Sequence, residues 1–245
     1  VERVTNVVAM MERTGMPLLL HGEVTDPDVD VFDREAVYIE RVLEPLRRRF
    51  PGLKVVLEHV TTADAVDYVL NVETGLAATI TPHHLMINRN AIFRGGLNPH
   101  MYCLPVAKRE RHRRALRGAA TSGDPRFFLG TDSAPHPRRD KETDCGCAGI
   151  FNAPTALASV VQVFEDEAAL DRVEAFTSVN GARFYGYAEN TGEIVLRKTA
   201  TSDKPPTSVA VGDDQVRVFI PQEPLTWDIA AGARHLAPEA RAALG

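Results

Sequence analysis

Short apolar runs alternate with longer amphipathic stretches along this chain, and the alternation predicts a sheet whose strands are linked by helices. The apolar runs over 16–21, 53–59, 76–81 and 126–132 each have the length of one buried strand. Elsewhere apolar residues recur every three or four positions, as a helix with one buried face requires. This spacing predicts helices over 4–14, 32–50, 62–70, 110–121, 153–164 and 170–177. Strands that alternate with helices predict parallel βαβ units and an α/β fold.

Each predicted strand ends on polar residues that can bind a metal ion. The first two strands end at His21 and His59, the third leads into Pro82-His83-His84, and the fourth ends at Asp132. In parallel α/β folds the carboxyl ends of the strands carry the chemistry. Two imidazoles and one carboxylate can hold a zinc ion. The sequence therefore predicts a metal site built from His21, His59 and Asp132, with Asp132 placed to accept a proton.

Each of these residues also has a structural interpretation when it is taken alone. His21 could be a core histidine whose ring bonds a backbone carbonyl, and Asp132 could cap a following helix, although the nearby prolines argue against that helix. His83 and His84 could stand behind the metal ligands or be a solvated pair in a loop. Cys145-Gly146-Cys147 has the spacing of a metal or redox pair, but with no second cysteine pair a tight loop is the better interpretation.

Composition and charge exclude several functional classes. The chain has 245 residues and a formal net charge of −5, which argues against binding nucleic acid through a basic face. No run of 18 apolar residues offers a membrane span, and the first residues lack the apolar region of a signal peptide. Three cysteines are too few for a disulfide framework, so a cytoplasmic location is expected. No phosphate-loop or dinucleotide motif is present.

Six motifs between about Met11 and Tyr185 closely resemble, in order, the dihydroorotase family of the amidohydrolase superfamily, in its single-function and usually homodimeric form. The motifs are His21-Gly22-Glu23-Val24-Thr25, Glu58-His59-Val60-Thr61-Thr62, Ala78-Thr79-Ile80-Thr81-Pro82-His83-His84-Leu85-Met86, Pro99-His100-Met101-Tyr102-Cys103-Leu104-Pro105, Gly130-Thr131-Asp132-Ser133-Ala134-Pro135-His136 and Cys145-Gly146-Cys147-Ala148-Gly149. The resemblance weakens in the C-terminal part, where Trp227 could lie in a matching closing segment.

The resemblance implies a zinc-dependent (β/α)8 TIM barrel that interconverts N-carbamoyl-L-aspartate and dihydroorotate in pyrimidine biosynthesis, with two zinc ions per active site. It implies that His21 and His59 bind the more exposed zinc, and that Asp132 binds the buried zinc and acts as general acid and base. The small-molecule substrate would be the main partner, and the protein would be a homodimer that binds neither nucleic acid nor membrane.

The resemblance also assigns substrate contacts. His136 matches a histidine that contacts the substrate carboxylate, and Leu104 matches a position whose backbone touches the pyrimidine ring. Ala148 and Gly149 match backbone donors in the loop beside the substrate. This assignment gives the Cys145-Gly146-Cys147 segment a loop role.

Other features of the family cannot be placed in this chain. The chain contains no His-x-His, and no lysine ends a strand before His21. The arginine and asparagine that hold the substrate carboxylate also lack counterparts. The four βα units are half of those in a full barrel. We therefore expect residues 1–186 to form the C-terminal half of the barrel and residues 187–245 to close the same domain. An open half-barrel would expose a sheet edge, so the chain alone should be poorly stable or one piece of a larger molecule.

Two rival functions remain open from the sequence. Another cyclic-amide hydrolase, such as a hydantoinase or allantoinase, would use the same metal chemistry with different substrate loops. A non-catalytic barrel relic that binds a partner or metabolite would have no chemical need for an aspartate beside two histidines.

Overall fold

A parallel four-stranded sheet lies at the centre of the computed structural model, which describes residues 2–199 and 206–230. The strands are β1 (Leu18–His21), β2 (Val55–Glu58), β3 (Leu76–Ile80) and β4 (Phe127–Leu129), and they lie side by side in chain order. All three pairings are parallel, with Leu18 opposite Val55, Val55 opposite Leu76, and Ala78 opposite Phe127. The predicted α/β class and all four predicted strands are confirmed.

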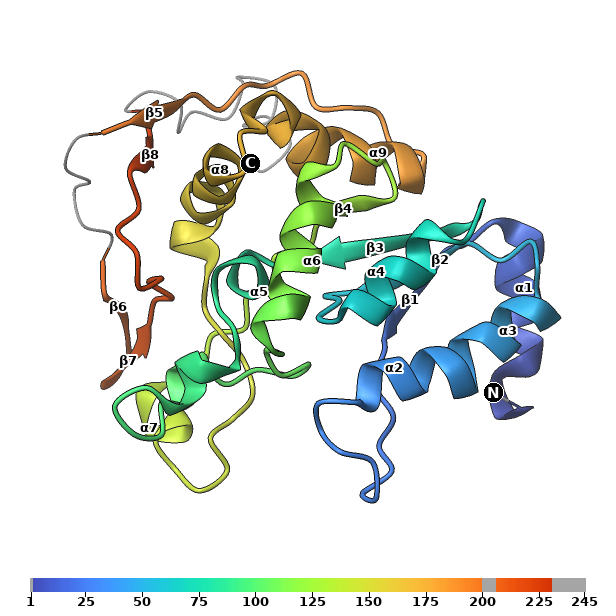
Figure 1. Ribbon diagram of the computed structural model, residues 1–245, viewed down its shortest axis with the longest axis horizontal. Coiled ribbons are helices and arrows are strands. Elements are labelled where there is room, and N and C mark those ends of the chain that lie inside the picture. Colours follow the sequence, from blue (N-terminus) through green and yellow to red (C-terminus); the bar gives the residue numbers. More distant parts are fainter. Residues whose placement is uncertain (1, 200–205, 231–245) are drawn as a thin grey trace.

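Helices connect the strands and cover one face of the sheet (Figure 1). A short 3₁₀ turn (Glu2–Val4) leads into α1 (Thr5–Thr14), which ends at Gly15 in a left-handed conformation (φ 71°). The predicted helix over 32–50 is α2 (Arg34–Tyr38) and α3 (Glu44–Arg49), joined by a π-helical turn at Ile39–Leu43. The next connections are α4 (Ala63–Leu70) and α6 (Glu110–Thr121), and α6 has the bounds that the sequence predicts.

The segment between β3 and α6 contains more helical structure than the sequence predicts. Where the sequence suggests only a loop, the structure has α5 (Pro82–Met86) and two 3₁₀ turns, Arg89–Phe93 and Pro99–Met101. The helix α5 begins at Thr81, whose hydroxyl accepts a hydrogen bond from the backbone N–H of His84. A threonine cap followed by proline is a favourable helix start even for a helix of five residues.

After β4 the chain forms α7 (Arg138–Lys141), α8 (Ala156–Asp166) and α9 (Asn180–Tyr185). Helix α8 follows a 3₁₀ turn at Ala153–Thr155, and α9 follows a 3₁₀ turn at Leu170–Arg172 and a π-helical turn at Ala175–Val179. The helix predicted over 153–164 is confirmed as the 3₁₀ turn and α8, and the one predicted over 170–177 is present as the 3₁₀ and π-helical turns that lead into α9. Helix α7 falls where the prolines argued against a helix, and Pro137 immediately precedes it.

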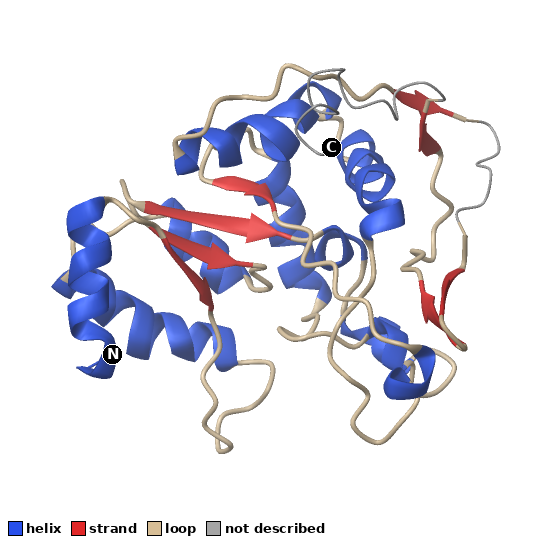
Figure 2. Ribbon diagram, turned by 180° about the vertical axis from the view of Figure 1, so that it is seen from behind, coloured by secondary structure: helices blue, strands red, loops and turns tan. Residues whose placement is uncertain are grey.

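Four short strands that the sequence analysis did not predict lie in the C-terminal part. They form two antiparallel pairs, β5 (Leu196–Lys198) with β8 (Trp227–Ile229) and β6 (Ser208–Val211) with β7 (Asp214–Arg217). Both pairs lie at the side of the molecule opposite α1 (Figures 1 and 2). Trp227 is in β8 and donates a hydrogen bond to Glu165 of α8. The proposed closing segment 187–245 is thus described over 187–199 and 206–230.

The two faces of the central sheet pack differently. Side chains such as Leu57, Ile80 and Phe127 point into the main core, which the helices around the sheet complete. Val56, Ala77 and Phe128 point to the other face, where a smaller cluster includes Phe184 and Tyr185. The carboxyl ends of the strands, which carry the predicted site residues, therefore rest on a rigid buried sheet.

Candidate active site

The predicted metal ligands lie at the carboxyl ends of neighbouring strands. His21 is the last residue of β1 and pairs with Glu58 of β2, which His59 follows directly. Asp132 follows β4 after Gly130 and Thr131. His59 and Asp132 both adopt positive φ angles, 42° and 41°. A non-glycine residue in this conformation costs about 1–3 kcal/mol and is concentrated at functional sites.

The rings of His21 and His59 face each other in a way that suits a shared metal ion. Nδ1 of His21 lies 3.3 Å from Nε2 of His59, and the rings are edge to face. Two nitrogen ligands at about 2.0–2.1 Å from a tetrahedral zinc ion are separated by about 3.3–3.4 Å. The two nitrogens therefore already have the separation that a common zinc ion requires. Nδ1 of His59 is buried without a hydrogen-bond partner among the described residues.

Glu23 fixes the orientation of the His21 ring. Its Oε2 lies 3.2 Å from Nε2 of His21, so that nitrogen carries the proton and donates it to the carboxylate. The lone pair of Nδ1 then points toward His59. A metal-binding histidine commonly donates its other N–H to a carboxylate, which fixes the tautomer and strengthens the ligand.

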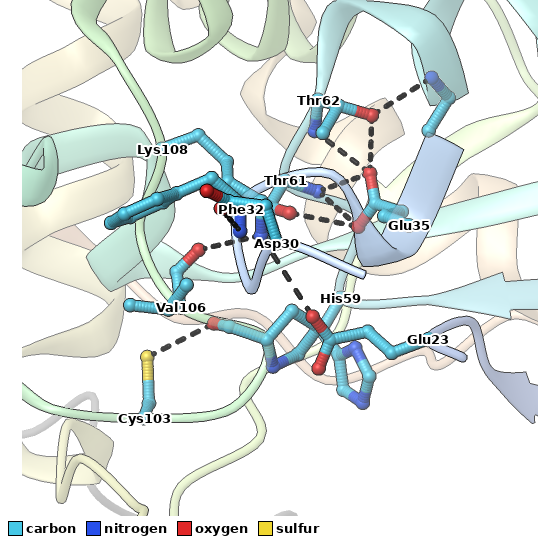
Figure 3. Close-up of polar contacts among 12 residues, drawn as sticks. Glu23, Asp30, Phe32, Glu35, His59, Thr61, Thr62, Cys103, Val106 and Lys108 are labelled. Carbon is cyan, nitrogen blue, oxygen red and sulfur yellow. Dashed lines mark hydrogen bonds and ion pairs between the residues drawn. The ribbon is translucent and has the colours of Figure 1, made fainter. Parts of the chain in front are cut away.

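The buried Lys108 lies next to Glu23 (Figure 3). The ammonium of Lys108 lies 3.9 Å from Oε1 of Glu23 and donates a hydrogen bond to the Val106 carbonyl. On its other side is Glu35, which is 1% exposed and accepts hydrogen bonds from the backbone N–H and hydroxyl groups of Thr61 and Thr62. These contacts tie the His21 side of the site to the start of α4.

Charge and burial around the site shift the pKa values of His21 and His59 in opposite directions. The hydrogen bond to Glu23 raises the pKa of His21, against an opposing effect of burial, and Asp132 also contributes to the increase. Burial and the nearby His21 lower the pKa of His59 to about 4. Burial raises the pKa of Asp132, although His21 partly offsets this. A carboxylate with a raised pKa is suited to exchange protons during a reaction.

His83 and His84 lie in the core, so the solvated-loop interpretation of this pair is wrong. Their side chains are 0% and 2% exposed, and with the buried Cys103 they form a group whose potential ligand atoms lie within 4.8 Å of one another. His84, however, donates from Nε2 to the Pro105 carbonyl and accepts at Nδ1 from the Thr81 hydroxyl. Burial also raises the pKa of the Cys103 thiol to about 12. With both His84 nitrogens bonded and the thiol protonated, we interpret this group as structural.

The residues predicted to contact substrate lie in two loops that touch each other. Nε2 of His136 donates a hydrogen bond to the Ala148 carbonyl at 3.1 Å. The Gly149 N–H donates to the Tyr102 carbonyl at 3.0 Å, so this group is not free to bind a ligand. A side chain at Gly149 would place its Cβ 2.7 Å from the His136 ring. Leu104 precedes a cis peptide bond to Pro105, and His84 holds the Pro105 carbonyl.

The sequence analysis did not identify several polar residues that support the site. Glu23, Lys108, Lys141 and Asn152 all make polar contacts there. Glu23 could have been noticed because it follows His21 by two residues. Lys108 and Asn152 are far in sequence from Glu23 and His83, and the partners of Lys141 are backbone carbonyls, which carry no sequence motif.

A family model and curated proteins both identify relatives of this chain. The amidohydrolase family model matches residues 2–201. A curated relative from Chelativorans sp. (strain BNC1), named dihydroorotase, is 58% identical over 229 residues, which are 94% of this chain and 66% of that protein. Across the curated relatives it matches, the chain spans about 55–67% of their length.

Solved structures extend the comparison to the fold. A dihydroorotase from Saccharomyces cerevisiae in complex with 5-fluoroorotic acid matches with a TM-score of 0.79 and 32% identity, covering 94% of this chain and 67% of that chain. An L-hydantoinase (dihydropyrimidinase) from Arthrobacter aurescens matches with a TM-score of 0.66 at 18% identity, over 80% of this chain and 51% of that chain. The second likeness shows the fold alone. No helix in the described part of the chain is long and apolar enough to cross a membrane.

Proposed function

Because the chain belongs to the amidohydrolase family, we propose that its site is the zinc-binding part of a dihydroorotase, which cyclises N-carbamoyl-L-aspartate to dihydroorotate reversibly. The observation that carries this proposal is the 3.3 Å separation of Nδ1 of His21 and Nε2 of His59 at the strand ends. The names and identities of the curated relatives support the choice of reaction. This chain contains no His-x-His and no lysine that ends a strand before His21. Other residues would therefore have to provide the remaining ligands of a two-zinc site.

His21 and His59 would hold the more exposed zinc ion, and Asp132 would hold the buried one. Zinc bound there would lower the pKa of a bound water and polarise the ring carbonyl of the substrate. In ring opening, a carboxylate oxygen of Asp132 accepts the proton of the attacking water and then donates it to the leaving ring nitrogen.

The two loops would hold the substrate. His136 and the Ala148 N–H would bind its carboxylate, and the backbone of Leu104 would lie beside the pyrimidine ring. We assign Gly149 the role of keeping the loop close to His136, since its own N–H is already bonded. We also propose a homodimer, which the resemblance to the dihydroorotase family implies, that works in the cytoplasm, which the three free cysteines support.

The test is a substrate and metal comparison on the full-length protein. We expect the purified protein to contain zinc and to hydrolyse dihydroorotate in preference to hydantoin and allantoin. Removal of zinc by a chelator should abolish turnover, and added zinc should restore it. Preference for hydantoin or allantoin would support the hydrolase rivals, whereas a metal-free protein without turnover would support the binding relic. Sedimentation analysis would test the dimer.

A further inference from the structure

Lys141 is a buried lysine next to the loops proposed to hold the substrate, and it takes no part in the proposed metal binding or proton transfer. It is the last residue of α7 and is 2% exposed, although the side chains of its neighbours Arg138 and Arg139 are 52% and 65% exposed. Burial lowers its pKa to about 8. No carboxylate of the described residues forms an ion pair with it. Burying an ammonium without a carboxylate is unfavourable unless other groups satisfy its donors.

Three backbone carbonyls provide those acceptors. The ammonium donates to the carbonyl oxygens of Tyr102 at 3.0 Å, Cys147 at 2.6 Å and Gly149 at 2.9 Å. An ammonium has three N–H donors, so every one is used. Tyr102 belongs to the Leu104 loop, and Cys147 and Gly149 belong to the Ala148 loop. Lys141 therefore joins the two loops at one point.

These bonds also determine which way the peptide between Cys147 and Ala148 faces. In a trans peptide, the carbonyl of one residue and the N–H of the next point in opposite directions. The only cis peptide among the described residues is Leu104–Pro105. With the Cys147 carbonyl bonded to Lys141, the Ala148 N–H must point away from the lysine. No described residue accepts a hydrogen bond from this N–H.

Three residues around this peptide have positive φ angles, which is an unfavourable conformation for a non-glycine residue. Gly146, Cys147 and Gly149 have φ angles of 68°, 24° and 155°. A positive φ at a non-glycine residue such as Cys147 is strained and persists when its surroundings enforce it. The Lys141 ammonium, bonded to the carbonyls on both sides of Ala148, supplies this enforcement.

We propose that Lys141 is a positioning residue, which holds the loops so that the Ala148 N–H is presented to the carboxylate of an orotate-like substrate. The proposal rests on the proposed function. His136 is bonded to the Ala148 carbonyl, which belongs to the next peptide along the chain, between Ala148 and Gly149. A fixed N–H donor that no described protein group uses suits a carboxylate. Lys141 itself does not touch the substrate in this arrangement, since its three donors are occupied.

The test is Lys141→Met in the full-length protein, with the same substitution at the exposed Lys54 as the matched control. Without the ammonium the loop loses its single conformation, and one charge-directed hydrogen bond to the substrate weakens. We expect about tenfold weaker binding of orotate by calorimetry, a change of about 1.4 kcal/mol. Zinc content should stay at the level of the unsubstituted protein, because no predicted ligand is altered.

Comparing KM with kcat distinguishes a positioning role of Lys141 from a general loss of folded structure. A contact that is equally strong in ground and transition states affects KM rather than kcat. We therefore expect Lys141→Met to raise KM for dihydroorotate about tenfold and to change kcat by less than about threefold. Lys141→Gln, which keeps two N–H donors, should restore part of the affinity. Unchanged KM and orotate affinity in both variants would overturn the proposal.

A structure of the unsubstituted protein with orotate provides the test if the variants do not fold. The proposal requires the orotate carboxylate within hydrogen-bond distance of the Ala148 nitrogen while Lys141 still bonds the Cys147 carbonyl. A carboxylate bound elsewhere, or a reversed peptide, would overturn it. An unsubstituted protein that neither binds orotate nor turns over dihydroorotate would instead reject the proposed function.

Discussion

At the scale of single residues, the site depends on pairs in which one group fixes the other. Glu23 holds the His21 ring, and Lys108 neutralises Glu23 from the side away from the ring. Neither partner was expected from the sequence, whereas His21, His59 and Asp132 were identified by their position at strand ends. Strand ends can be found from hydrophobic pattern, but the residue that orients a ligand depends on tertiary contacts.

Glu23→Gln tests this arrangement through metal affinity. The amide removes the charge that strengthens the His21 ligand and can present an N–H in place of the acceptor. Loss of such a carboxylate partner typically weakens metal binding about 10–100-fold. We expect a loss in this range when zinc is titrated against a competing chelator. Glu40→Gln, at an exposed position, should bind zinc as the unsubstituted protein does. Equal affinities in the two variants would show that Glu23 does not support His21.

At the scale of elements, the long regular units were predictable and the short capped ones were not. Helix α6 has its predicted bounds because it is a long helix of 12 residues, in which Leu116, Ala119 and Ala120 recur at three- or four-residue spacing on the buried side. Helix α5 was missed because it has five residues, too few for a periodic pattern, and because its start depends on the Thr81 cap. The strands β5 to β8 have three or four residues each and gave no clear alternation.

Helix α5 carries His83 into the core, which makes the stability of the protein dependent on pH. Burial lowers the pKa of His83 to about 3, and an unfolded histidine titrates near 6.5. Between these values the unfolded state binds more protons than the folded state, so the free energy of unfolding decreases as pH falls from about 6.5 toward 3. His83→Asn keeps an acceptor for the Asn152 amide but removes the titrating ring.

The expected result is a shallower loss of stability on acidification in His83→Asn. A single histidine contributes a slope of up to about 1.4 kcal/mol per pH unit. Urea unfolding at pH 7, 6 and 5 measures this slope, and the slopes are compared because the cavity left by the ring lowers the absolute stability at every pH. Parallel curves for the two proteins would mean that His83 does not titrate on unfolding.

At the scale of the whole molecule, the order of the sheet determines which residues meet. Because β1 to β4 are parallel and adjacent in chain order, His21, His59 and Asp132 reach the same edge. The fold class and the family could be predicted from the sequence, and both are confirmed. The domain bounds and the metal and substrate ligands stay predictions. So does the poor stability of the chain on its own, which urea unfolding of residues 1–245 would measure.

The most direct measurement is the turnover of dihydroorotate by Asp132→Asn in the full-length protein, with Asp67→Asn on the exposed surface of α4 as control. Asparagine keeps the shape of the side chain but can neither accept the proton nor return it. General acid–base catalysis contributes about 10²–10⁴-fold, so the account predicts a loss of at least that size, with the control unchanged. Near-normal turnover by Asp132→Asn would contradict the assignment of Asp132 as the acid and base of this site.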